Sequence, residues 1–220
     1  MNLLFSVFGL IGGLLCCAGD IFLDLKGPGN QKLGTSKNID SNWIKMAEWR
    51  FGVSILCAMV GVIGGGFGFY SIANQIYEAH KVLASVLAVT GYIGTVGGFF
   101  VHSVLCLQAI IYKRIMSGGE KNFEIADHTL EGLYKAVILP FFLLYAILMI
   151  ADVCVSIAVL AGALPVPKWM ALLNSIVFMI IGSVIFRKIN PEKFQDLPGI
   201  IMPSLGIAMV GLIGIAALVV

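Results

Sequence analysis

The residue with the clearest chemical potential is Asp152, because it lies in the most apolar stretch of the chain. No other charged side chain occurs between Lys135 and Lys168. A carboxylate at that depth in a bilayer costs about 2.5–3.5 kcal/mol or more, so it is usually paired or functional. Tyr145 lies seven residues before Asp152 and Ser156 four residues after it, which places all three on one face of a helix. Such a face could bind a polar ligand or handle a proton.

Asn174 is the expected neighbour of Asp152. It lies in the next apolar segment, about as far from the turn that contains Pro165 and Pro167 as Asp152 does. The two side chains can therefore meet at the same depth in the membrane. One interpretation is a hydrogen bond that fixes helix packing, which stabilises such a pair by about 0.6 kcal/mol. The other is a desolvated carboxylate that binds a ligand or a proton.

Two further polar groups lie in or beside apolar segments. His102 lies well inside one segment and could be a packed hydrogen-bonding residue, a proton relay, or a contact to a ligand or metal. Asp20 and Asp24 end the first segment, near Glu48 and Arg50. They could form an ion-pair cluster at the membrane boundary or a charged mouth that leads to the interior. The candidate ligand-binding residues are Asp20, His102, Tyr145, Asp152, Ser156 and Asn174.

The sequence predicts neither a metal site nor a cofactor, and it assigns no catalytic residue. Glu124, His128 and Glu131 could present three metal ligands on one helical face, but the solvated face of a surface helix explains the same pattern. A bis-histidine haem would need a second buried histidine beside His102. The five cysteines all fall in apolar segments, without the paired Cys/His spacing of a zinc site.

Composition indicates an integral membrane protein. Of the 220 residues, 59% are hydrophobic and 12% are charged, which is more apolar surface than a soluble domain of this length can bury. Six apolar stretches are about long enough to cross a bilayer. We therefore predict an all-α fold, a polytopic bundle of about six transmembrane helices in a single domain over residues 1–220. The helices are expected near residues 3–23, 51–73, 82–112, 136–163, 169–186 and 199–220.

The distribution of Lys and Arg predicts the orientation. The first, third and fifth loops hold all but two of the 14 basic residues, and only Lys81 and Lys168 lie in the second and fourth. By the positive-inside rule, the odd-numbered loops are cytoplasmic and both termini face outward. We expect a multi-pass protein of the cell membrane. Its net charge of +2 argues against a nucleic-acid partner, so the expected partner is a membrane lipid or small hydrophobic ligand, with oligomerisation left open.

Three local patterns predict packing around these spans. Glycines at four-residue spacing in the second and third spans predict that these two helices pack closely. These spacings are Gly61/Gly65, Gly64/Gly68 and Gly94/Gly98. Residues 123–137 place apolar and acidic side chains on opposite helical faces, which predicts a short amphipathic helix on the cytoplasmic surface. The polar stretch from Lys26 to Lys45 is expected to be a cytoplasmic turn region.

Two resemblances add to these inferences. The stretch LPGIIMPSLGIAMVGLIGI that begins at Leu197, with Gly19 and Asp20, resembles an uncharacterised family of bacterial six-pass membrane proteins, which implies no activity. The order Gly19, Asp20, His102 and Asp152 is similar to the aspartate and histidine arrangement of the lysoplasmalogenase family of membrane hydrolases. That resemblance implies an ether-lipid hydrolase with Asp20 and Asp152 as catalytic carboxylates and His102 nearby. The chain departs from that family in a longer interval between Asp20 and His102, and in six rather than eight spans.

Three functions therefore remain open. The first is a membrane protein that binds or moves a small apolar or amphipathic solute in a polar-lined pocket between helices, because buried polar groups at several depths suit such a path. The second is an intramembrane lipid hydrolase that uses buried Asp and His. The third is a structural or accessory membrane subunit, for which one buried Asp–Asn contact would suffice.

Overall fold

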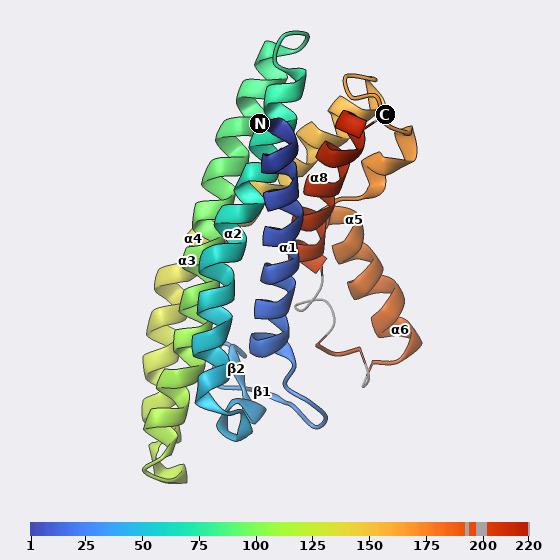
Figure 1. The fold of residues 1–220 in the computed structure, drawn as a ribbon. Coiled ribbons are helices and arrows are strands. Elements are labelled where there is room, and N and C mark those ends of the chain that lie inside the picture. The colour runs from blue at the N-terminus through green and yellow to red at the C-terminus, as the bar shows by residue number, and fades with distance from the viewer. Residues whose placement is uncertain (192–193, 197–201, 220) are drawn as a thin grey trace.

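The computed structural model describes residues 1–191, 194–196 and 202–219 and is built from helices (Figure 1). Four of them are long and apolar enough to cross a membrane, which takes about 20 residues. These are α1 (Asn2–Asp24), α2 (Glu48–Ile76), α3 (Lys81–Met116) and α4 (Phe123–Leu160). The all-α prediction is confirmed, and these helices are those of a membrane protein.

The last two predicted spans are less regular than the first four. Residues 169–186 do not form one α-helix. The segment contains η3 (Lys168–Leu172, a 3₁₀ turn), α5 (Ser175–Ile180), η4 (Ile181–Phe186, π-helical) and α6 (Arg187–Ile189). The last helix, α8 (Met202–Val219), has 18 residues, and positions 199–201 and 220 of the predicted span lie outside the described residues. A bundle of six spans therefore stays a prediction.

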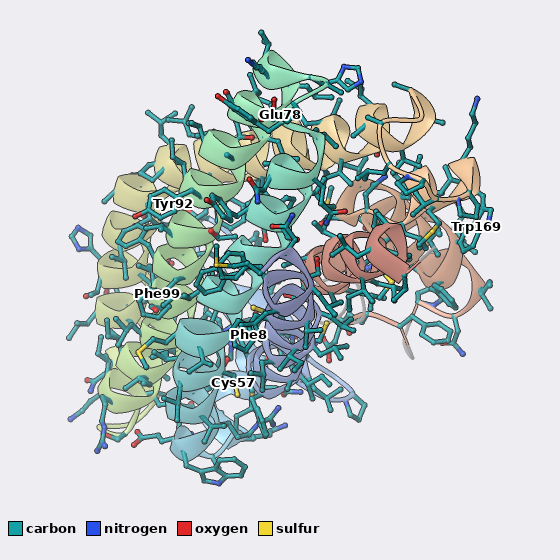
Figure 2. All side chains as sticks on the ribbon, turned by 45° about the horizontal axis from the view of Figure 1, so that its top comes forward. Phe8, Cys57, Glu78, Tyr92, Phe99 and Trp169 are labelled. Atoms are coloured by element: carbon teal, nitrogen blue, oxygen red, sulfur yellow. The ribbon has the colours of Figure 1, made fainter. Side chains whose placement is uncertain are left out.

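The helices pack in the spatial order α4, α3, α2, α1, α8, α5 (Figure 1). Both termini lie at one end of the molecule, and the loop between α1 and α2 lies at the other end. Large apolar side chains cover the outside, and Figure 2 shows Tyr92 and Trp169 among those that project outward. An outer surface of this kind is suited to lipid rather than to water.

Glycines allow α1 to approach α2 and α8 closely. A Cβ atom added to Gly12 would lie 2.6 Å from the carbonyl oxygen of Gly61 and against the backbone nitrogen of Gly65. A Cβ atom added to Gly13, on the other side of α1, would meet the backbone of Ala208 in α8. Backbones this close leave no space for a side chain, as in other small-residue contacts between membrane helices.

The expectation that the α2 glycines pack against α3 is wrong for most of them. Gly61 and Gly64 face α1 instead, where a Cβ atom added to either would meet the backbone of Gly12. The predicted packing of α2 against α3 is confirmed, but there a glycine of one helix faces a side chain of the other. Phe69 of α2 packs against Gly91 of α3.

The loop between α1 and α2 (residues 25–47) is an ordered unit rather than a simple turn. It contains an antiparallel pair, β1 (Lys32–Leu33) and β2 (Ile39–Asp40), followed by η1 (Ser41–Lys45). The buried Asp40 carboxylate accepts a hydrogen bond from Asn30 Nδ2 at 2.6 Å and pairs with Lys32 at 3.0 Å. Burial would lower the pKa of Lys26, but Asp24, Asp40 and Asp196 around it raise that pKa above its ordinary value. These contacts give the loop a fixed shape at the end of α1.

The amphipathic segment 123–137 is not a separate helix but the first part of α4, which continues through Pro140 to Leu160. Its predicted apolar face is confirmed. Ala126 and Leu130 are buried in a core that also contains residues of the α1–α2 loop. A second core lies toward the termini and contains the last part of α4. The helix therefore joins two separate packed regions.

Replacing Gly12 by alanine should destabilise the protein by about 1–3 kcal/mol, because the new methyl group must displace the backbone of α2. Gly52→Ala is the matched control, since a Cβ at Gly52 of α2 would have no atom within 4 Å. The control should leave stability unchanged or raise it by up to about 1 kcal/mol, because alanine favours a helix over glycine. Thermal unfolding of both variants in one detergent measures the difference. An unchanged midpoint for Gly12→Ala would argue against the close packing.

Candidate functional site

A cavity of about 530 Å³ lies between α1, α2, α3, α4, α5, η4 and α8. Its volume lies within the range of roughly 300–1,000 Å³ that is usual for small-molecule sites. Most of its wall is apolar, with Val62, Val101 and Leu148 among the contributing residues. The polar and charged residues of the wall are Asp20, Asp24, His102, Tyr145, Ser183 and Ser204. Three of the six candidate residues, Asp20, His102 and Tyr145, therefore border one space.

Asp20 connects three helices at this cavity. Its Oδ1 lies 3.3 Å from His102 Nδ1 of α3, and its Oδ2 accepts a hydrogen bond from Ser204 Oγ of α8 at 2.5 Å. The side chains of Asp20 and His102 are each only 12% exposed. Asp20 reaches this position because it lies on the same buried face of α1 as Gly12, Gly13 and Cys16. The close approach of α1 to its neighbours thus brings the carboxylate to its partners.

Ser54 of α2 determines which nitrogen of His102 carries a proton. Its Oγ donates to the carbonyl oxygen of Gly19 at 2.7 Å and lies 2.7 Å from His102 Nε2. A serine hydroxyl has a single proton, and a carbonyl oxygen can only accept. Ser54 must therefore accept from His102, which assigns a proton to Nε2 from the hydrogen-bond network.

With Nε2 protonated, the contact between His102 and Asp20 requires one more proton. If Nδ1 and Oδ1 both lacked a proton, two lone pairs would face each other at 3.3 Å. The proton lies either on Nδ1, as in an imidazolium–carboxylate pair, or on Oδ1, as in a neutral imidazole and a carboxylic acid. Both forms have no net charge, which suits a buried pair. Such a pair can give a proton to a ligand and take it back.

The sequence of contacts Ser54–His102–Asp20 resembles a nucleophilic triad, but its hydrogen bonds run in the opposite direction. In a triad the serine hydroxyl donates to the histidine, whereas Ser54 donates to Gly19 and accepts from His102. Ser54 is also fully buried and does not line the cavity. Ser54 therefore positions the imidazole and does not act as a nucleophile toward a molecule in the cavity.

Asp152 and Asn174 are not hydrogen-bonded partners, so the expected pair is wrong. Asn174 caps the start of α5, where its Oδ1 accepts from the backbone N–H of Val177 at 2.9 Å. Its Nδ2 donates to the carbonyl oxygen of Ala171 at 2.8 Å and to Ser156 Oγ at 3.2 Å. The expectation assumed a continuous fifth helix, but the helix breaks before Asn174 and capping uses its amide. Of the candidate residues, Asn174 therefore contacts Ser156.

Asp152 lines a second cavity of only about 10 Å³, which does not include Asp20 or His102. Tyr145 borders both this cavity and the larger one. The structure thus brings Asp20 and His102 together and places Asp152 elsewhere. The three residues implied by the lysoplasmalogenase resemblance do not meet in one cavity.

The expected ion-pair cluster around Asp20 does not form. Asp24 pairs with Lys26 at 2.7 Å. Arg50 donates at 2.9 Å to the carbonyl oxygen of Leu25, just after α1 ends. A cation at a helix C-terminus satisfies free carbonyl groups and the helix dipole. Arg50 is therefore occupied at the helix end, and Asp20 has His102 as its partner.

The described part of the chain contains no group of three or more His, Cys, Asp or Glu side chains that could hold a metal ion. Glu124 and His128 are exposed on α4. Glu131 pairs with Lys135 at 2.8 Å on the same helix. This face of α4 is therefore a solvated polar surface.

Sequence reasoning missed Ser54 and Ser204. The position of Ser54 could have been found from spacing, since Ser54, Ala58, Gly61 and Gly65 recur on one buried face of α2. The same face approaches α1, so a polar group on it must find a partner there. Ser204 has no comparable signal, because its contact depends on how α8 sits against α1.

Asp20→Asn should retain stability close to that of the wild type. The asparagine Nδ2 can donate to His102 Nδ1 while its oxygen accepts from Ser204. Asp20→Ala removes the side-chain partner of both His102 and Ser204, and it should lower the free energy of unfolding by about 1–3 kcal/mol. Thermal unfolding of the two variants in one detergent distinguishes them. An equal loss in both would be inconsistent with a pair that shares one proton.

Among the comparisons with known proteins, a match comes from a family model. No curated protein and no solved structure matches the chain. The model of a family of unknown function matches residues 1–219, which includes every residue of the cavity wall. The expected membership of an uncharacterised family is therefore confirmed. The chain belongs to DUF6796, a family of unknown function.

Proposed function

We propose that the protein binds a small amphipathic molecule in the cavity between its helices. The observation that carries this proposal is the presence of the Asp20–His102 pair in the wall of an otherwise apolar cavity of about 530 Å³. Apolar walls suit the hydrocarbon body of a ligand, and a few convergent polar groups orient its polar end. The shared proton of the pair suits a head group that exchanges hydrogen bonds or a proton.

Access from the bilayer supports this class of ligand. Phe142 of α4 lines the cavity, yet 63% of its surface is exposed on the outside of the protein. We place the opening of the cavity toward the bilayer beside Phe142, within an apolar part of α4. A molecule dissolved in the membrane can enter there without crossing water, which favours a lipid-derived or similarly hydrophobic compound.

A polar cavity adjoins the site at Asp24. Asp24 lines the cavity of about 530 Å³ and also a separate polar cavity of about 720 Å³ beside the α1–α2 loop. The wall of that polar cavity carries charges of both signs, from Lys26, Lys32 and Arg187 and from Asp24, Asp40 and Asp196. A ligand held between an apolar opening and a polar one could be moved as well as bound.

The proposed topology has six spans in the cell membrane, with both termini outward and the α1–α2 loop in the cytoplasm. The basic residues of the odd-numbered loops support this orientation. The fifth span would be interrupted at Asn174, with Ser183 of its π-helical part in the cavity wall. Interrupted helices and π-helical turns are typical where membrane segments line a binding site.

An intramembrane lipid hydrolase is the second candidate. Asp20 and His102 place an acid and a base in one cavity, where the pair could activate water against a bound lipid. This mechanism would need no serine nucleophile. It differs from simple binding in one observable way, because the bound lipid would be converted to products.

Gly98→Leu should block the cavity. A Cβ at Gly98 would meet only the side chain of Val62, at 3.9 Å, so a leucine fits the backbone and extends into the space that Gly98 lines. Gly132→Leu is the matched control, because a Cβ at Gly132 of α4 would have no atom within 4 Å and Gly132 is not in the wall. Native mass spectrometry should show a small molecule or lipid on the wild type and the control, but not on Gly98→Leu.

His102→Gln should weaken retention of the same species about tenfold or more, because a hydrogen bond to a charged group contributes about 1.5–3 kcal/mol. Identical bound species on all four proteins, or none on the wild type, would count against the proposal. Incubation of the wild type with membrane lipids separates the two candidates. Lipid products that disappear in His102→Gln would identify the hydrolase.

A further inference from the structure

Asp152 is a deeply buried carboxyl group that the proposed function does not use. It is 0% exposed, and no hydrogen bond of full geometry reaches either of its oxygens from the described residues. Ser175 lines the same small cavity and interacts with the carboxyl group through its side chain and its backbone N–H. We propose that Asp152 is a proton-binding site in addition to the Asp20–His102 pair. Its carboxyl group is held as a neutral acid that exchanges its proton, through Tyr145, with the cavity of about 530 Å³.

The described surroundings of Asp152 contain no cation that would balance a negative charge, and Ser175 alone among the lining residues offers hydrogen-bond donors to the carboxyl group. The small cavity is lined by residues of α4 and α5 alone, and among them Tyr145 is the only other ionisable side chain. None of the ion pairs formed by the described residues includes Asp152. An ionised carboxylate without water, a cation or full hydrogen bonds costs several kcal/mol. Binding a proton removes that cost.

A proton fits this site better than a metal cation does. The cavity of about 10 Å³ is at the lower limit for a single water molecule, roughly 10–15 Å³. Hard cations such as Ca²⁺ and Mg²⁺ take about six or more oxygen ligands, whereas Leu148, Met149 and Met179 supply no oxygen to this wall. The lining therefore provides one carboxyl group, two hydroxyl-bearing residues and otherwise apolar surface.

Tyr145 connects the small cavity at Asp152 with the cavity of about 530 Å³. It lines both spaces, as do Leu148, Met149 and Met179, so the two are separated only by shared side chains. A phenol can accept a proton from a carboxylic acid while donating its own. In one exchange the Asp152 proton passes to the Tyr145 oxygen while the Tyr145 proton passes to a basic group of a molecule in the cavity of about 530 Å³, and the reverse transfer returns Asp152 to its neutral form.

Infrared spectroscopy of the protein in lipid at neutral pH tests the protonation of Asp152. The wild type should show the carbonyl band of a carboxylic acid, and Asp152→Asn should lose it. Asp127→Asn is the matched control on the same helix, where the carboxylate accepts hydrogen bonds from Thr35, and it should keep the band. Asp20→Asn separates any contribution of the first pair. A spectrum in which Asp152→Asn loses no carboxylic acid band would overturn the proposal.

Transfer into deuterated buffer tests the route through Tyr145. The Asp152 band should shift at least tenfold more slowly in Tyr145→Phe than in the wild type, whereas Tyr134→Phe, outside both cavity walls, should exchange at the wild-type rate. Equal rates in all three proteins would overturn the exchange route. Gly98→Leu should retain the carboxylic acid band, because Gly98 does not line the small cavity. The protonation of Asp152 is therefore tested separately from ligand binding in the cavity of about 530 Å³.

Discussion

The close approach of α1 to α2 and α8 is the constraint on which the rest of the structure depends. Glycine faces remove the side chains that would hold these backbones apart, and that sets the rotation of α1 about its own axis. Asp20 follows the glycine face by helical spacing and is thereby turned toward Ser204 and His102. In the membrane, where helices gain little from hydrophobic burial against each other, packing of this kind and interhelical hydrogen bonds determine the arrangement.

The polar groups of the interior divide into those with a structural use and those that remain available. Ser54 and Asn174 are satisfied by backbone groups, at Gly19 and at the start of α5. The Asp20–His102 contact is different, because its proton can occupy either side and the pair faces an open space. A site that can change its proton without changing its net charge is inexpensive to keep in an apolar environment.

Hydropathy was sufficient to locate four membrane helices and to predict that Asp20, His102 and Asp152 are buried. Both predictions depend only on the position of a residue along an apolar segment. It could not identify partners, which depend on helix rotation. The sequence predicted matching depths for Asp152 and Asn174, yet the cap at the start of α5 uses the amide of Asn174, which contacts Ser156. The sequence does indicate the break in the fifth predicted span, since Pro167 and Asn174 are both typical of helix starts. Mean hydropathy along the segment could not show it, because hydropathy does not depend on backbone hydrogen bonds.

The course of α4 has a mechanical consequence for the cavity. Its two ends are anchored in separate cores, at Ala126 and Leu130 and again from Leu148 onward, while Pro140 lies between them. Proline removes one backbone hydrogen bond and weakens the helix locally. The most compliant turn of α4 is therefore the one next to Phe141 and Phe142 in the cavity wall. Flexure of this single turn would move Phe141 and Phe142 relative to the rest of the cavity wall while both anchored ends of the helix stay in place.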